Sequence, residues 1–580
     1  MKKYYINICM FALAALGMSS CGDDFLDEMP DNRTEIDTEE KAVSMLVSAY
    51  PTCDYGVVTE LSSDNVDDMG EKNPYSDRFF DQAYHWVDLT ETSNDDLESF
   101  WEKSYNAIAV ANEVLASMDK IAQNGGTQAK MDQIKAEALI SRAYNHFMLL
   151  NVFAKHYNKA TANTDLGITY MTEPEVTVNP AYSRQSVAEC YSLIEKDIEA
   201  ALPMIGESYM TVPKYHFNKR AAYAFAARFY LYYEKWDKVI TCAEQVLGAN
   251  PRTMLRDYEA MSKMTQEIDA ITQHYIDHTL NCNLLLIPTY SYKGIFVGPY
   301  SLFKRYVHCP YIDNNETLSA KHAWGGTNYY MGVKKYSATN LNIDILWKVP
   351  SMFEYTDAVA GIGFYHSVAT ELTCDETLID RAEAYIMLKE YDKACADMNI
   401  WLHNISKSRT EMTPEMITTF YQGIDYSYDD VQKDDEGNPV LDESGNKIIK
   451  HKAVATSTIK KHLNPAFVIG EEGSVQECML QCVLNVRRIQ TMHEGKRWFD
   501  IKRYGIEIPR RVMNTAGNPV RAYDWLTVDD ERRALQIPTK SISADYMPNP
   551  RGETTRTPDL ASDGIGGAMV PESKNNDTSM

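Results

Sequence analysis

The chain has 580 residues, of which 44% are hydrophobic and 24% are charged. This is the composition of a globular protein, and it excludes a disordered or collagen-like chain. The 57 basic and 82 acidic residues give a net charge of −25, which disfavours binding to nucleic-acid phosphates, so we expect no nucleic-acid partner. The 38 Tyr, 17 Phe and 8 Trp residues are enough to fill a core and also to build a stacking surface.

Residues 1–20 have the layout of a secretory signal peptide. Two lysines open the segment, and residues 6–17 are apolar but too few to span a bilayer, which takes about 20 residues. Two serines then precede Cys21, an order that resembles a bacterial lipobox, in which the cysteine is acylated. We expect lipidation at Cys21 and a lipid anchor; the alternative is ordinary secretion with a free thiol.

Nine further cysteines follow Cys21, an odd number without any CxxC pair. Neither a zinc ribbon nor a dense disulfide framework is indicated. Cys478 and Cys482 lie four residues apart on an expected helix, and we predict that both are small core residues rather than metal ligands.

Most of the chain has helical periodicity. In residues 101–118 the apolar side chains recur at steps of three and four residues, which predicts a helix with one buried face. Similar patterns occur in residues 129–153, 186–202, 218–247, 371–402 and 476–493. No comparable series of alternating strands is present, so the fold class is predicted to be mainly α.

Two helical pairs are related by an internal repeat. Residues 227–247 and 382–402 align without gaps at a spacing of 155, with a small residue early in the first helix and an aromatic residue just after the turn. This pattern is typical of tetratricopeptide-like helical hairpins. Residues 137–153 are expected to open a further hairpin.

Other segments lack the helical period. Residues 281–363 are expected to form an irregular insert with minor β elements, since glycine and aromatic residues cluster there. Residues 425–452 contain two turn signals, which predict a solvated loop or hairpin. The tail at about 553–580 is polar and is predicted to be flexible.

Several motifs occur in an order that resembles one protein family. They are TELSSDN at 59–65, WEKSYNAIAVAN at 101–112, EALISRAYNHFMLLNVFA at 137–154, EGKRWFDIKRYG at 494–505 and LQIPTKSI at 535–542. Together they resemble the SusD/RagB family of outer-membrane nutrient-binding lipoproteins. The residues Gly-Asp-Asp after Cys21 resemble the acidic surface-export tag of Bacteroidetes lipoproteins, which implies a location on the outer face of the cell outer membrane.

The resemblance implies one SusD-like domain over residues 21–580, with helical hairpins at about 101–250 and 370–505 and an irregular, loop-rich ligand-binding half. It also implies a SusC-like TonB-dependent barrel as partner. EGKRWFDIKRYG also has a physical interpretation of its own, because it mixes charged and aromatic side chains. We predict that it forms a buried ion-pair knot.

Candidate ligand contacts are predicted where aromatic planes lie beside amide or guanidinium groups, because sugar rings present both apolar faces and hydroxyls. The first cluster comprises Tyr75, Arg78, Tyr84 and Trp86. The second comprises Trp324, Asn328, Tyr329 and Tyr330, beside a Gly-Gly pair. The third comprises Tyr290, Tyr292 and Tyr300. Trp86 and Trp324 are the preferred candidates, and a core position is the alternative for each aromatic residue.

A metal site is not expected from the sequence. Asp64, Asn65, Asp67 and Asp68 could hold calcium, but their spacing lacks the EF-hand order, and loop hydrogen bonds are the favoured interpretation. No phosphate-binding glycine loop, HExxH motif or nucleophile elbow is present.

The sequence therefore predicts a lipoprotein that binds an oligosaccharide and delivers it to a TonB-dependent barrel, without catalysis and without a cofactor. A peptide-binding RagB-like protein and a helical-repeat interaction scaffold remain as alternatives. A glycoside hydrolase is disfavoured, because no pair of carboxylates in a cleft is specified.

Overall fold

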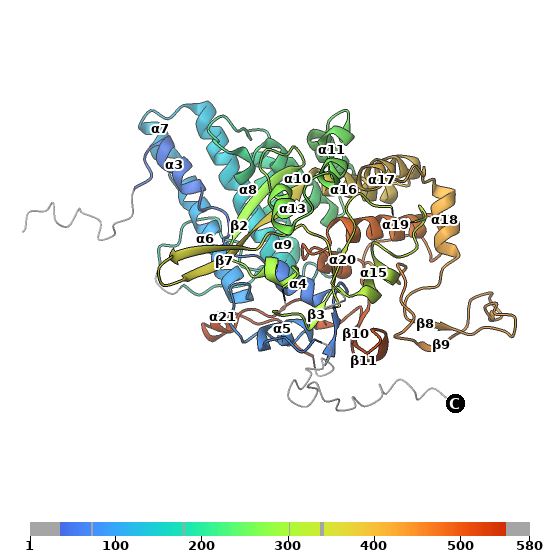
Figure 1. Ribbon diagram of the computed structural model, residues 1–580. Helices are drawn as coiled ribbons and strands as arrows, with labels where there is room; N and C mark the ends of the chain where they lie inside the picture. The colour runs from blue at the N-terminus through green and yellow to red at the C-terminus, as the bar shows by residue number, and fades with distance from the viewer. Residues whose placement is uncertain are drawn as a thin grey trace, which may run out of the picture.

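The computed structural model describes residues 35–552 except 71–72, 178–179, 301, 327 and 337–341. The predicted signal peptide, Cys21 and the tail at 553–580 lie outside these residues. Helices dominate the described chain and the strands are short (Figure 1), which confirms the mainly α fold class with minor β elements. None of the helices in these ranges combines the length and the apolar character that crossing a bilayer requires.

The helices run along the whole described chain. Those before residue 280 are α3 (Glu39–Leu46), α4 (Gly56–Ser62), α5 (Arg78–Tyr84), α6 (Leu97–Ala116), α7 (Met118–Gln123), α8 (Gln128–Phe153), α9 (Val187–Ala201), α10 (Lys219–Tyr232), α11 (Trp236–Leu247), α12 (Tyr258–Ser262) and α13 (Ile268–Tyr275). Those after it are α14 (Lys293–Phe296), α15 (Pro310–Glu316), α16 (Cys374–Met387), α17 (Tyr391–Ile405), α18 (Pro414–Gln422), α19 (Val475–Gln490), α20 (Arg497–Arg503) and α21 (Thr539–Ser543).

Helix starts follow from local capping chemistry. Ser186 and Glu189 form a capping box at the start of α9. Asn218, Thr373 and Ser474 accept backbone N–H groups at the starts of α10, α16 and α19. Each cap satisfies a donor that the first turn leaves without a partner, so these starts are specified by the residues themselves.

The predicted repeat is confirmed as two equivalent helical hairpins. Helix α10 packs against α11, and α16 packs against α17. Glu234 and Lys389 hold matching left-handed turn positions, with φ of 59° and 62°, and they are 155 residues apart, as the alignment requires. Trp236 and Tyr391 begin the second helix of each pair. The third expected hairpin also forms, because α8 packs against α9.

The strands form small sheets between the helices. They are β1 (Asp67–Asp68), β2 (Asn283–Thr289), β3 (Tyr306–Val307), β4 (Lys334–Lys335), β5 (Asp344–Ile345), β6 (Met352–Asp357), β7 (Ile362–Thr373), β8 (Asp429–Val431), β9 (Ile449–Lys452), β10 (Ile508–Met513) and β11 (Pro519–Leu526). One sheet has the order β11-β10-β1-β3 and another has the order β2-β7-β6. Figure 1 shows the hairpin of β6 and β7 projecting on one side of the molecule and the β8–β9 arm on the other.

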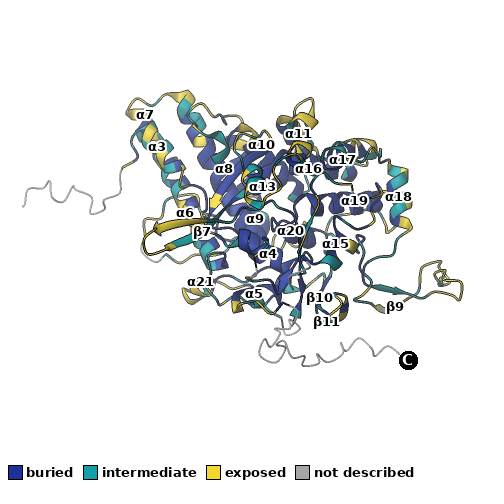
Figure 2. Ribbon diagram, viewed as in Figure 1, coloured by how far each residue is buried: buried dark blue, intermediate teal, exposed yellow. Residues whose placement is uncertain are grey.

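A dense hydrophobic core lies between the helices, and Figure 2 shows that α8, α10, α16, α19 and α20 are largely buried. The nine cysteines of the described residues are buried and free. Cys478 and Cys482 are both fully buried in α19, which confirms that they are core residues.

The predicted ion-pair knot is confirmed. The charged residues of the 494–505 segment are buried, and all but Lys502 form ion pairs with other elements: Glu494 with Lys348, Lys496 with Glu376, Arg497 with Asp64, Asp500 with Arg487, and Arg503 with Glu383. Lys502 donates instead to the carbonyl groups of Asn151 and Ala154. The charges of Arg487 and Arg503 outweigh the cost of burial and lower the pKa of Glu383 to about 2.

The residues weighed as calcium ligands are engaged by arginines instead. Both carboxylate oxygens of Asp64 accept hydrogen bonds from Arg497, at 2.9 and 3.0 Å. Asp67 and Asp68 are held in the same bidentate way by Arg511 and Arg305. Within the described residues no group of three or more His, Cys, Asp or Glu side chains could hold a metal ion.

Glu316 is a second centre of this buried network. Its carboxylate lies 2.8 Å from Lys461, 2.8 Å from Arg511 and 3.1 Å from Arg488. Burial alone would favour the neutral acid, but these three cations hold the pKa of Glu316 well below its ordinary value. The carboxylate therefore stays charged and joins α15, α19 and β10.

We expect Glu316→Gln to lower the free energy of unfolding by about 3–5 kcal/mol, because it leaves buried cations without their counter-charge. Urea unfolding at neutral pH measures this loss. Lys263→Gln is the matched control, since it breaks the exposed ion pair with Glu259 and should cost less than about 0.5 kcal/mol. Equal small losses in the two variants would show that the buried network is dispensable.

Candidate functional site

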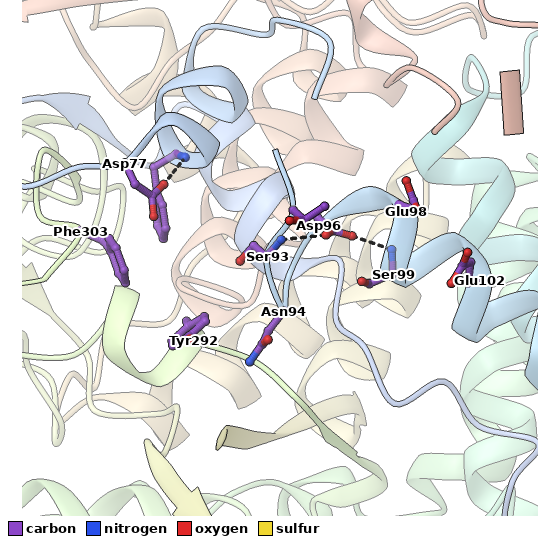
Figure 3. A pocket seen from close by; sticks show the side chains of 11 residues that line it. Asp77, Ser93, Asn94, Asp96, Glu98, Ser99, Glu102, Tyr292 and Phe303 are labelled. Atoms are coloured by element: carbon purple, nitrogen blue, oxygen red, sulfur yellow. Dashed lines mark hydrogen bonds between the residues drawn. The ribbon is translucent and has the colours of Figure 1, made fainter. Parts of the chain in front are cut away.

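An open cavity of about 570 Å³ lies where three parts of the chain meet. Its described lining residues are Asp77, Phe80, Thr92, Ser93, Asn94, Asp96, Glu98, Ser99, Glu102, Tyr292 and Phe303. Figure 3 shows Tyr292 and Phe303 on one side, the start of α6 on the other, and Asn94 between them. We call this cavity the α6 pocket. Its size is in the usual range for a small-molecule site.

The aromatic wall of the α6 pocket is built from residues far apart in sequence. Phe303 stacks on Phe80 with ring centroids 4.5 Å apart, and Tyr292 meets Phe303 edge to face at 6.1 Å. Phe303 has a φ of 58°, a left-handed conformation that is costly for a bulky residue. The stacking on Phe80 holds Phe303 in this conformation and turns its ring toward the cavity.

The polar wall is the loop that leads into α6. Asp96 accepts hydrogen bonds from the backbone N–H groups of Ser93, at 2.7 Å, and Ser99, at 2.6 Å. It thereby caps α6 and fixes the loop, as the dashed lines of Figure 3 mark. Asn94 is half-buried at the centre of this wall, where a short amide can exchange hydrogen bonds with hydroxyl groups.

Asp95 ties the two walls together. Its carboxylate is buried and accepts hydrogen bonds from the hydroxyl group of Ser291 and from the backbone N–H of Tyr292, the latter at 2.8 Å. Burial is the main cause that raises the pKa of Asp95 to about 7, and the two hydrogen bonds oppose this rise. Asp95 is therefore a positioning residue for Tyr292.

The first predicted cluster is largely wrong as a stacking surface, because its main aromatic residues are buried. The indole N–H of Trp86 donates to the Ser62 carbonyl at 2.9 Å, and the guanidinium of Arg510 lies 3.8 Å from its ring. Tyr84 is also buried against Arg510. The two rings enclose a buried cation, so neither can reach a ligand. Tyr75 and Arg78 are exposed but do not line the α6 pocket, and Arg78 pairs with Glu91.

The second predicted cluster lies away from the α6 pocket. Trp324 is 3% exposed and stacks on His322 at 4.3 Å, so its prediction as a stacking platform is also wrong. Tyr329 forms a bridge with Ser406 at the end of α17, and the hydroxyl of Tyr330 donates to Glu259. Asn328 is exposed. As ligand contacts, Asn328, Tyr329 and Tyr330 stay predictions.

The third predicted cluster supplies the residue that reaches the α6 pocket, Tyr292. Tyr290 and Tyr300 are exposed, and Tyr290 packs against Phe364 of β7. Phe80, Phe303 and the Thr92–Ser93–Asn94 loop also line the pocket and were not predicted from the sequence. The polar run at 91–94 was the available signal, because a short polar loop just before a helix can face a ligand.

We expect the stability contributed by Asp95 to decline as the pH rises. Its folded pKa of about 7 exceeds the ordinary 3.8, so the folded chain holds a proton that the unfolded chain has lost between these values. Asp95→Asn mimics the protonated acid. Between about pH 5 and pH 8, the wild type should lose about 2–3 kcal/mol of unfolding free energy relative to the variant, as urea titrations would measure. A difference that stays constant over this range would contradict the assignment.

The comparisons with known proteins agree with the fold. A family model described as starch-binding and associating with the outer membrane, SusD-like, matches residues 24–231. No curated protein matches the chain significantly.

Several solved structures from Bacteroides species are similar to the chain. A SusD superfamily protein from Bacteroides thetaiotaomicron is 16% identical, with a TM-score of 0.55, covering 89% of this chain and 100% of its own. A putative sugar binding protein from Bacteroides vulgatus is 17% identical, with a TM-score of 0.56 and coverages of 89% and 99%. A SusD superfamily protein from Bacteroides fragilis is 16% identical, with a TM-score of 0.57 and coverages of 88% and 99%.

At these identities the structural likeness shows the fold, and the family model adds the match in sequence. Together they confirm the resemblance to the SusD/RagB family that the motifs indicated: residues 24–231 match the SusD-like family model, and the described chain has the fold of SusD superfamily structures.

Proposed function

We propose that the chain is a lipid-anchored protein of the outer cell surface that binds a glycan in the α6 pocket and delivers it to a SusC-like TonB-dependent barrel. Two findings support this proposal. The matching family model is described as starch-binding and associating with the outer membrane, and one similar structure is named as a putative sugar binding protein. Lipidation of Cys21 and the barrel partner belong to the proposal and follow from the resemblance of the motifs.

The observation that carries the glycan assignment is the composition of the α6 pocket. Tyr292 and Phe303 offer ring faces for the apolar C–H side of a sugar. Ser93, Asn94 and Ser99 offer short hydroxyl and amide groups on the opposing wall. A sugar ring has both an apolar face and hydroxyl groups at its edge, so it matches both walls at once.

The lining carboxylates have partners that suit binding better than acid–base catalysis. Asp77 caps α5 by accepting from the Phe80 N–H, and Asp96 caps α6. Glu98 and Glu102 lie beside Lys540. We infer that the glycan leaves the site chemically unchanged. A labelled polysaccharide incubated with the protein should stay intact, whereas released oligosaccharides would indicate a hydrolase.

We expect Tyr292→Ala to weaken glycan binding about five- to tenfold, since one aromatic–sugar contact is worth roughly 1 kcal/mol. A glycan array with the soluble chain starting after Cys21 identifies the ligand, and titration calorimetry then measures the affinity. Tyr182→Ala is the matched control, because it removes a partly exposed ring that does not line the pocket. A wild type that retains no glycan, or a Tyr292→Ala variant of unchanged affinity, would overturn the assignment of this site.

A further inference from the structure

A row of aromatic side chains extends along the hairpin of β6 and β7. Phe353 and Tyr355 alternate along β6, so both lie on one face, and Phe353 pairs across the hairpin with Tyr365. The ring centroid of Phe353 lies 4.9 Å from that of Tyr355 and 4.9 Å from that of Tyr365. The side chains of Phe353 and Tyr355 are 37% and 60% exposed, and Figure 2 shows the exposed outer end of the hairpin. We call Tyr365, Phe353 and Tyr355 the hairpin ridge.

The hairpin ridge continues the α6 pocket. Tyr292 lines the pocket, and its ring lies 5.4 Å from that of Tyr365. Aromatic contacts therefore run without a break from Phe303 through Tyr292 to Phe353 and Tyr355. A long ligand bound in the pocket can therefore extend out of it along this row of aromatic rings.

The hairpin is built to hold these rings in place. A Cβ atom at Gly363 would lie 2.7 Å from the ring of Phe353 and 2.1 Å from the carbonyl oxygen of Glu354, so only glycine leaves room for this arrangement. The inner half of β7 pairs with β2, as far as Thr373 opposite Asn283. Tyr365 thus lies on a strand that is anchored in the core, and Phe353 and Tyr355 lie on β6, which pairs with that strand, so the rings need little ordering when a ligand binds.

The joint surface carries acidic groups and no lysine or arginine among its described residues. Asp77, Asp96, Glu98 and Glu102 line the pocket, and Asp357 ends β6 beyond Tyr355. Residues 352–366 contain neither lysine nor arginine. Two cations beside this surface are paired with acidic side chains, Lys540 with Glu98 and Glu102, and Arg78 with Glu91. A chain of uronates or sulfated sugars would meet like charges here, whereas a neutral or amine-bearing chain would not.

We propose that the hairpin ridge is a second subsite that continues the α6 pocket, and that the joint surface binds a chain of neutral or amine-bearing sugars longer than the pocket alone. The inference rests on the proposed glycan-binding function. Its new content is the contribution of Phe353 and Tyr355 and the exclusion of acidic glycans.

The test uses a double variant, Phe353→Ser with Tyr355→Ser, in the soluble chain starting after Cys21. Leu441→Ser is the matched control, because Leu441 is also exposed and belongs to the arm on the opposite side of the molecule (Figure 1). Urea unfolding checks that both variants keep the stability of the wild type. The probes in affinity gels are starch, xylan, chitosan, polygalacturonate and chondroitin sulfate.

We expect the gels that contain a neutral or amine-bearing polymer to retain the wild type and the gels of the two acidic polymers not to retain it. The double variant should bind the retained polymer about thirtyfold more weakly, because it loses two aromatic contacts of roughly 1 kcal/mol each, while its affinity for a disaccharide of the same polymer stays unchanged. Leu441→Ser should behave as the wild type in both measurements.

Three outcomes would overturn the inference. Retention of the wild type by the acidic polymers would contradict the exclusion of acidic glycans. Unchanged affinity of the double variant for the long chain would contradict the second subsite, and this is the result expected if the hairpin contacts a partner protein instead. If the wild type binds no probe and no glycan on an array, the proposed function itself fails. If Tyr292→Ala weakens binding and the double variant does not, the pocket binds glycan and only the second subsite fails. Failure of the proposed function is recognised by the absence of any binding in the wild type.

Discussion

Buried carboxylates paired with arginines are the constraint on which the arrangement of this chain depends. A charge removed from water must be paired, since an unpaired one costs several kcal/mol. Asp64, Asp67 and Asp68 follow one another within a few residues, yet their arginines come from α20, β10 and the position just before β3. Each pair admits one bidentate geometry, so the short segment at 64–68 fixes where three distant elements lie.

This network determines the position of the α6 pocket. The segment 64–68 leads through residues 73–77 into α5, whose first turn lines the cavity, and Arg305 follows Phe303 closely in the chain. The ion pair between Arg305 and Asp68 thus brings the Phe303 segment to the α5 segment, where Phe303 meets Phe80. Asp95 then adds the third wall by accepting from Ser291 and Tyr292.

The roles of the two tryptophans show how aromatic residues divide between core and surface. Trp86 ends up buried because Arg510, from β10, needs a partner for a charge that lies in the interior, and the indole face provides one. Trp324 is buried by stacking on His322 and by the edge contact with Trp401 of α17. Their sequence neighbourhoods, rich in polar and glycine residues, are typical of exposed loops. The partners that bury both rings include residues far along the chain.

Local sequence patterns were sufficient to predict the helical scaffold. The 3.6-residue period, the caps and the repeat at a spacing of 155 specify α10–α11 and α16–α17, down to the left-handed turn residues Glu234 and Lys389. The ligand surface could not be derived in this way. Trp86 is buried by Arg510 and Tyr292 is positioned by Asp95, each about 200 or more positions away in the chain. The burial of such a ring is decided by what packs against it and not by its own neighbours in the chain.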